Sequence, residues 1–98
     1  MPTTKYEKGR AFEYTIRNKL RAKGYYVIRA AGSKPIDLVA IRNGEVILVE
    51  CKKNKKNVTQ TVKDYLTYLG KTLNVKTIIA YKDKGRITIE IIYDPQES

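Results

Sequence analysis

The chain has 98 residues, and its 20 lysines and arginines against 10 acidic residues favour a polyanionic partner such as nucleic acid over a membrane surface. Its length fits a single domain over residues 1–98, and its 42% hydrophobic content excludes an intrinsically disordered chain. It has no histidine and one cysteine, which excludes histidine-based catalysis and disulfide frameworks, and the lack of a signal peptide or membrane-spanning run favours an intracellular protein.

Apolar periodicity and turn residues divide the chain into seven elements. Phe12, Ile16 and Leu20 recur at helical spacing, whereas apolar and polar residues alternate near the end of the chain. The predicted elements are a helix over residues 7–23, a strand over 25–29, two hairpin strands over 36–42 and 45–52, a helix over 58–73, and strands over 76–81 and 86–93. This α-β-β-β-α-β-β order predicts an α/β fold in which helices flank one central mixed sheet.

The central hairpin brings two acidic residues together. Asn43 and Gly44 lie between two apolar runs, which is the strongest short signal for a two-residue hairpin turn. Counting back from this turn, Asp37 faces Glu50 across the open end of the hairpin, about 5 Å away at Cβ. Lys52 follows two residues later and therefore points to the same face. These side chains predict a metal-dependent site that cleaves phosphodiesters, and the alternative is a pair of strand-end carboxylates bound to nearby lysines or arginines.

Asp37 followed by Glu50-Cys51-Lys52 resembles the split D…ExK signature of the PD-(D/E)xK nuclease superfamily, which has a restriction-endonuclease-like fold. Three segments resemble the archaeal Holliday junction resolvases within it: residues 8–13, 27–40 and 49–52. The likeness fades after Lys52. It implies a homodimeric endonuclease that uses Mg²⁺, or Mn²⁺ as a substitute, to cut branched DNA symmetrically at four-way junctions.

The resemblance also implies roles for the residues around the acid pair. Asp37 and Glu50 would be direct metal ligands, with the backbone carbonyl of Cys51 as a third. Lys52 would orient the attacking water or offset the charge that develops on the phosphate.

Two further catalytic candidates have ordinary structural alternatives. Glu13 lies at the edge of the apolar stripe of the first helix, where the resemblance makes it a metal ligand, directly or through water. Its alternative is an ion pair with Arg10 or Arg17 on the helix surface. Ser33 matches a loop serine that contacts phosphate in the resolvases, and its alternative is simple turn chemistry. Basic side chains near the acids form a candidate DNA-binding surface: Lys8, Arg10, Arg29, Lys34, Lys53, Lys55 and Lys56.

Two other functions stay open beside junction resolution. The first is a nuclease of the same superfamily that acts on other DNA, as a nicking, repair or restriction-type enzyme. The second is a non-catalytic DNA-binding module on the same fold. On the second helix, Tyr65, Tyr68 and Leu69 are candidates for a dimer face, although core packing is the preferred interpretation for Tyr65.

Overall fold

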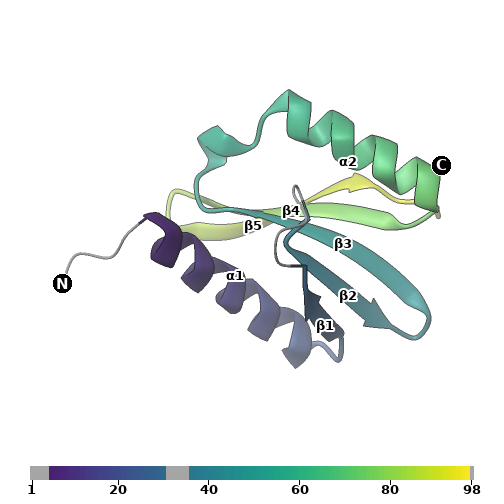
Figure 1. Cartoon of the computed structure of the whole chain (residues 1–98), viewed down its shortest axis with the longest axis horizontal. Helices are drawn as coiled ribbons and strands as arrows, with labels where there is room; N and C mark the ends of the chain where they lie inside the picture. The colour runs from purple at the N-terminus through teal and green to yellow at the C-terminus, as the bar shows by residue number, and fades with distance from the viewer. Residues whose placement is uncertain (1–4, 31–35, 98) are drawn as a thin grey trace.

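The computed structural model describes residues 5–30 and 36–97, with side chains from residue 9 onward (Figure 1). Its elements are α1 (Lys5–Ala22), β1 (Tyr26–Arg29), β2 (Leu38–Arg42), β3 (Glu45–Lys52), the short 3₁₀ helix η1 (Lys55–Asn57), α2 (Gln60–Leu73), β4 (Lys76–Asp83) and β5 (Arg86–Tyr93). This order confirms the predicted α/β fold, and η1 is an addition within a segment that was expected to be a loop. No helix in the described part of the chain is long and apolar enough to cross a membrane.

The five strands form one mixed sheet in the order β1-β2-β3-β4-β5. Neighbouring strands are antiparallel except β3 and β4, which are parallel and are joined by the crossover through α2. Because β3 and β4 run in the same direction, their carboxyl ends lie at the same edge of the sheet. The segments that follow these two strands therefore come together there.

The β2–β3 hairpin has the predicted register. Asn43 and Gly44 have φ values of 50° and 77°, the left-handed conformation that a tight two-residue hairpin turn requires. Leu38 pairs with Val49, so the next step along the ladder brings Asp37 opposite the residue after Val49. The backbone amide of Asp37 donates to the Val49 carbonyl at 2.9 Å, which holds this acid against β3 just beyond the last paired residue of β2.

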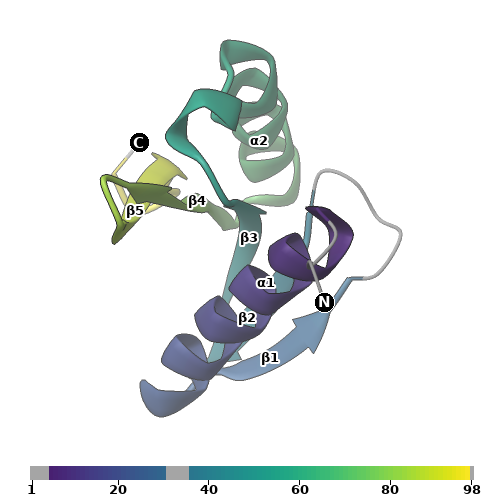
Figure 2. The same ribbon diagram turned by 90° about the vertical axis from the view of Figure 1, so that its left-hand side faces the viewer.

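The two helices cover opposite faces of the sheet. Figure 2 shows α1 lying along β1, β2 and β3, whereas α2 packs against β4 and β5 from the other side. The core on the α1 face is built from Phe12, Ile16, Val27, Leu38, Ala40, Ile47, Val49, Ile78 and Ala80. The smaller core on the α2 face is built from Leu66, Ile79 and Tyr81. Each helix is too narrow for five strands, so part of each sheet face stays uncovered.

The contact line of α2 runs through Leu66 and Gly70, which are both buried. The Thr77 hydroxyl of β4 donates to the Leu66 carbonyl at 3.1 Å and anchors the helix to the sheet. Tyr65 is one residue, or about 100°, away from Leu66, and its side chain is 44% exposed. The preferred interpretation of Tyr65 as a core residue was therefore wrong, because apolar periodicity does not specify which sector of a helix meets the sheet.

We predict that Gly70→Ala destabilises the protein. An added Cβ would lie 2.6 Å from Cδ2 of Tyr93, which forces the helix and β5 apart. Overpacking of this kind costs about 1–3 kcal/mol in the free energy of unfolding, measurable by urea denaturation. Gly9→Ala is the matched control in α1, because nothing lies within 4 Å of its added Cβ. Equal stability of the two variants would contradict the close approach of α2 and β5.

Candidate active site

The carboxylates of Asp37 and Glu50 meet at the open end of the β2–β3 hairpin. The backbone amide of Cys51 donates to Oδ2 of Asp37 at 2.8 Å and to Oε1 of Glu50 at 3.1 Å. One amide proton therefore bonds to an oxygen of each carboxylate. The two acids lie close together, as the hairpin register predicted. Glu50 is only 3% exposed, so solvent does little to reduce the repulsion between these two acids.

The environment of this pair favours a bound proton or a bound cation. Burial raises the pKa of Glu50 from 4.5 to about 9, and the hydrogen bond and negative charge of Asp37 act in the same direction. The positive charge of Lys52 lowers this pKa but does not outweigh burial. At neutral pH, Glu50 is therefore protonated unless a cation takes the place of the proton. An all-oxygen donor set of two converging carboxylates fits a hard divalent cation such as Mg²⁺.

Lys52 lies beside the acid pair, whereas the side chain of Cys51 turns away from it. The ammonium nitrogen of Lys52 is 3.8 Å from Oε2 of Glu50, so the predicted placement of both on one face is confirmed. The Cys51 thiol packs against the core on the α1 face, and burial raises its pKa far above the ordinary value. The thiol therefore stays neutral, and only the backbone of Cys51 is available to the site.

Glu13 approaches the acid pair from α1, and its ion-pair partner lies on β1. Its Oε1 is 3.5 Å from Nε of Arg29, and the charge of Arg10, one of the two partners expected from the sequence, also lowers the pKa of Glu13. Burial raises the pKa of Glu13, and the charge of Asp37 contributes in the same direction, which indicates that the two acids interact. Within the described residues, no group of three or more acidic, cysteine or histidine side chains converges on a metal position.

The candidate DNA-binding residues differ in how far the structure describes them. Lys53, Lys55 and Lys56 follow β3 directly, and Nζ of Lys55 is 3.5 Å from Oδ2 of Asp83. That contact ties η1 to the β4–β5 hairpin beside the acid pair. Three candidates lie outside what the structure describes, namely Ser33, Lys34 and the side chain of Lys8.

A second basic segment at this edge of the sheet was missed by the sequence interpretation. Lys52 pairs with Tyr81, so the residues after Tyr81 project past the end of β3 on the same side. This hairpin tip, which consists of residues 82–86, exposes Lys82, Lys84 and Arg86. The available signal was indirect: two strands joined by a helix are parallel, so a turn after the second strand lies near the end of the first.

The sequence and the fold of this chain are similar to those of known proteins. A family model for the archaeal Holliday junction resolvase (Hjc) matches residues 4–93 of the chain. A crossover junction endodeoxyribonuclease Hjc from Methanocaldococcus jannaschii is 50% identical over 52 residues, so the match covers 53% of this chain and only 39% of that protein. The structure of Hjc, a Holliday junction resolvase from Archaeoglobus fulgidus, has a similar fold, with a TM-score of 0.69 and 21% identity over 87% of this chain and 73% of that one. The chain therefore belongs to the archaeal Holliday junction resolvase family.

Proposed function

We propose that this protein is a metal-dependent endonuclease that resolves four-way DNA junctions by paired phosphodiester hydrolysis. The observation that carries this proposal is the pairing of the buried Glu50 with the half-buried Asp37, with Lys52 beside them. Two carboxylates that repel each other inside a protein are unfavourable for folding, and a bound cation removes the repulsion. The name of the Methanocaldococcus jannaschii relative supports a junction-cutting activity for this chain.

Asp37, Glu50 and the backbone carbonyl of Cys51 would hold Mg²⁺, with Mn²⁺ as a substitute. When bound, the cation would polarise the scissile phosphate and lower the pKa of an attacking water. Lys52 would place a positive charge against the phosphate as negative charge develops on its oxygens, because its ammonium lies on the same face as Glu50. Glu13 would act through water and would hold Arg29 at the rim of the site by their ion pair.

Symmetric cutting of a junction requires two equivalent sites at a fixed spacing, which a two-fold homodimer supplies. The exposed side of α2 is the surface that we propose for this contact. The rings of Tyr65 and Tyr68 pack there at an angle of 46° with centroids 6.2 Å apart, and Tyr68 is 61% exposed. Leu73 is exposed on the same helix, and aromatic and apolar side chains are enriched in the buried centre of protein interfaces.

We predict that Glu50→Gln and Asp37→Asn each remove cleavage of a labelled four-way junction in Mg²⁺. Loss of an outer-shell partner of a metal site costs about 10–100-fold, so loss of a ligand should exceed about 100-fold in rate. Junction binding should persist, because neither substitution removes a positive charge. Glu45→Gln is the control, since Glu45 is an exposed acid at the far end of the same hairpin.

The choice of DNA substrates in this assay separates the remaining functions. Paired cuts in the junction, with linear duplex left intact, support the proposal. Equal cutting of linear duplex would leave a nuclease of the superfamily that lacks junction selectivity. Tight junction binding without any cut in Mg²⁺ or Mn²⁺ would point to a non-catalytic binding module and would refute the catalytic proposal.

We also predict that the hairpin tip contacts the DNA backbone. The double variant Lys84→Glu/Arg86→Glu should weaken junction binding and lower the slope of log affinity against log salt by about 2, one for each lost phosphate contact. Lys19→Glu/Arg21→Glu makes the same charge change at the opposite end of α1 and should keep the wild-type slope. Equal slopes of log affinity against log salt for the two double variants would show that the hairpin tip does not contact the DNA.

The dimer contact predicts that Tyr68→Glu yields a monomer in sedimentation experiments. A buried, unpaired carboxylate at the centre of an interface opposes association. Tyr26→Glu is the matched control, because Tyr26 is also highly exposed but lies on β1. A wild-type protein that sediments as a monomer, or a Tyr68→Glu variant that remains dimeric, would show that α2 is not the contact.

A further inference from the structure

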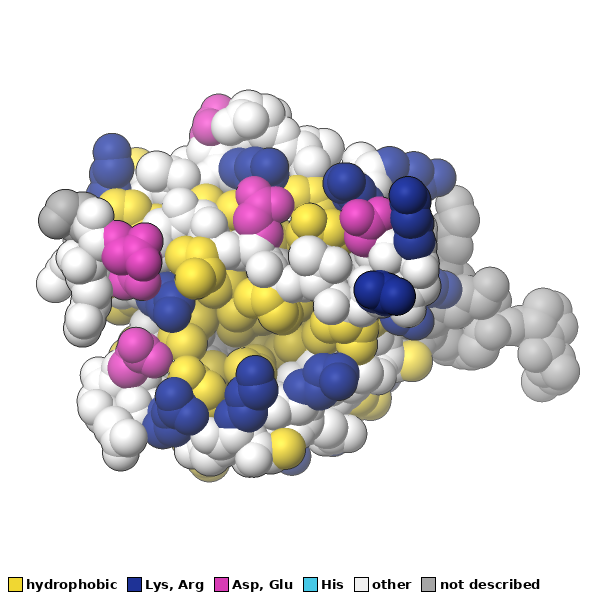
Figure 3. Space-filling view, turned by 180° about the vertical axis from the view of Figure 1, so that it is seen from behind, with side chains coloured by type: hydrophobic (Ala, Val, Ile, Leu, Met, Phe, Trp, Pro, Cys, Tyr) yellow, Lys and Arg dark blue, Asp and Glu magenta, His cyan; other side chains and the backbone are white. Residues whose placement is uncertain are grey.

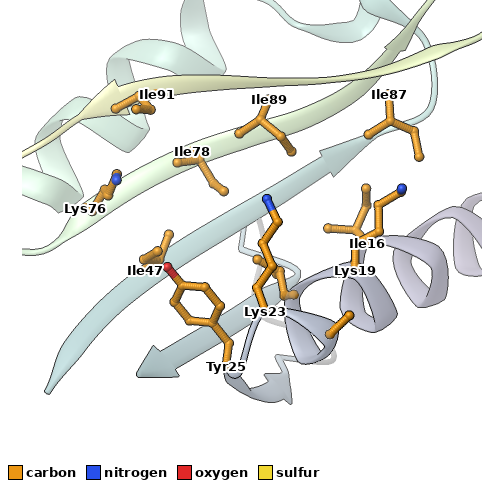
Figure 4. Close-up of a pocket in the computed structure, with 12 residues that line it drawn as sticks. Ile16, Lys19, Lys23, Tyr25, Ile47, Lys76, Ile78, Ile87, Ile89 and Ile91 are labelled. Atoms are coloured by element: carbon orange, nitrogen blue, oxygen red, sulfur yellow. The ribbon is translucent and has the colours of Figure 1, made fainter. Parts of the chain in front are cut away.

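An apolar groove runs between α1 and the β4–β5 half of the sheet. Its volume is about 570 Å³, and isoleucines from three strands form its floor. Figure 3 shows it as a hollow of hydrophobic side chains bordered below by lysines and arginines. In Figure 4, Ile87, Ile89 and Ile91 lie along β5 and face α1, and Lys19 of α1 and Lys23 just after it extend toward them.

This groove leaves more apolar surface in water than packing of the monomer requires. Ile89 is 50% exposed and Ile91 is 51% exposed, although both lie on the same sheet face as the core under α1. They are uncovered because α1 lies over β1, β2 and β3, whereas α2 covers β4 and β5 only from the opposite face. A groove of exposed apolar side chains is a candidate interaction site.

The charged side chains that line the groove are lysines, although two carboxylates contact the lining: Asp94 lies beside Lys76, and Glu45 accepts a hydrogen bond from the Tyr25 hydroxyl. Lys19, Lys23 and Lys76 are among the residues that line it, and its described lining contains no carboxylate. Lys76 lies 4.0 Å from Asp94, at the limit of an ion pair, whereas Lys19 and Lys23 form no ion pair with a carboxylate in the described part of the chain. The border along α1 can therefore accept negative charge from a partner.

We propose that the groove docks an amphipathic helix of an acidic protein partner, with apolar side chains on the isoleucines and carboxylates against Lys19 and Lys23. A helix placed beside α1 would complete the helical layer on this face of the sheet, as α/β folds require. A second copy of this chain fits the lysine border less well, because its 20 lysines and arginines outnumber its 10 acidic residues. DNA would neutralise the lysines but would leave Ile89 and Ile91 against a charged backbone.

The dimensions of the groove set the length of the docked segment. Ile87 and Ile91 are four residues apart on β5, which is about 13 Å along a strand. A helix covers that distance in about nine residues, so its apolar contacts would recur at positions i, i+3, i+4 and i+7. Acidic residues on either side of this stripe would reach the lysines of α1.

The test uses three labelled 18-residue peptides: a helix with a leucine stripe flanked by glutamates, the same residues in scrambled order, and the leucine helix with lysines in place of the glutamates. Fluorescence anisotropy should show binding of the acidic amphipathic helix alone.

Ile89→Asp should weaken that binding at least about tenfold, the effect of losing a central contact. Ile28→Asp is the matched control, since Ile28 is similarly exposed on β1. Lys19→Glu/Lys23→Glu should abolish binding of the acidic helix and permit binding of the lysine peptide.

Equal binding of the scrambled peptide would reduce the contact to nonspecific charge attraction and overturn the proposal. Equal effects of Ile28→Asp and Ile89→Asp, or no binding at all, would also overturn it. Loss of a wild-type dimer in Ile89→Asp would identify a second copy as the occupant instead. Junction cleavage by Ile89→Asp should match wild type, because Ile89 makes no contact with the acid pair, so this outcome is independent of the nuclease proposal.

Discussion

The backbone amide of Cys51 donates hydrogen bonds to the carboxylates of both Asp37 and Glu50, and the geometry of the whole site depends on this shared contact. Asp37 and Glu50 can meet there only if β2 and β3 keep the register that Asn43 and Gly44 fix. A slip of one residue would move Glu50 to the other face of the sheet and separate the acids. The core on the α1 face, to which β3 contributes Ile47 and Val49, supplies the stability that holds this pair against its own repulsion. The two carboxylates are therefore already close together. The raised pKa of Glu50 favours a proton on its carboxyl group, at the position where we propose that a cation binds.

The parallel pairing of β3 and β4 then decides which basic residues surround the acids. Both strands end at one edge, so η1 and the β4–β5 hairpin tip flank Lys52 although they are far apart in the sequence. At the opposite end of α1, Lys19 and Lys23 border isoleucines and have no carboxylate pair beside them. Two groups of basic residues thus lie in different surroundings on this chain, whose formal charge is +10. Basic side chains beside a metal site suit a phosphate backbone, whereas basic side chains around an apolar floor suit an acidic protein.

Local signals predicted the parts of this structure that depend on local chemistry. The hairpin turn requires two left-handed residues, and Asn43-Gly44 meets that requirement within two positions, so the opposition of the acids followed by counting. The partner of Glu13 was not predictable in this way, because Arg29 is brought to it by packing of α1 on β1 and not by helical spacing. The exposure of Tyr65 depends equally on distant residues, since the close approach of Gly70 to Tyr93 sets the rotation of α2. The sequence therefore predicted the helices and strands correctly, but it did not predict which residues of different elements contact each other.

The diagonal placement of the two helices keeps the three exposed surfaces apart. The outer side of α2 lies on one face of the sheet, and the groove beside α1 lies on the opposite face. The acid pair lies at the edge where the strands end. A dimer formed through α2 would therefore leave the groove and the active-site edge free. An acidic helix in the groove would also neutralise positive charge far from Asp37 and Glu50. Because long-range attraction follows the summed charge distribution, the remaining field would then favour approach of DNA at the edge that carries the acid pair.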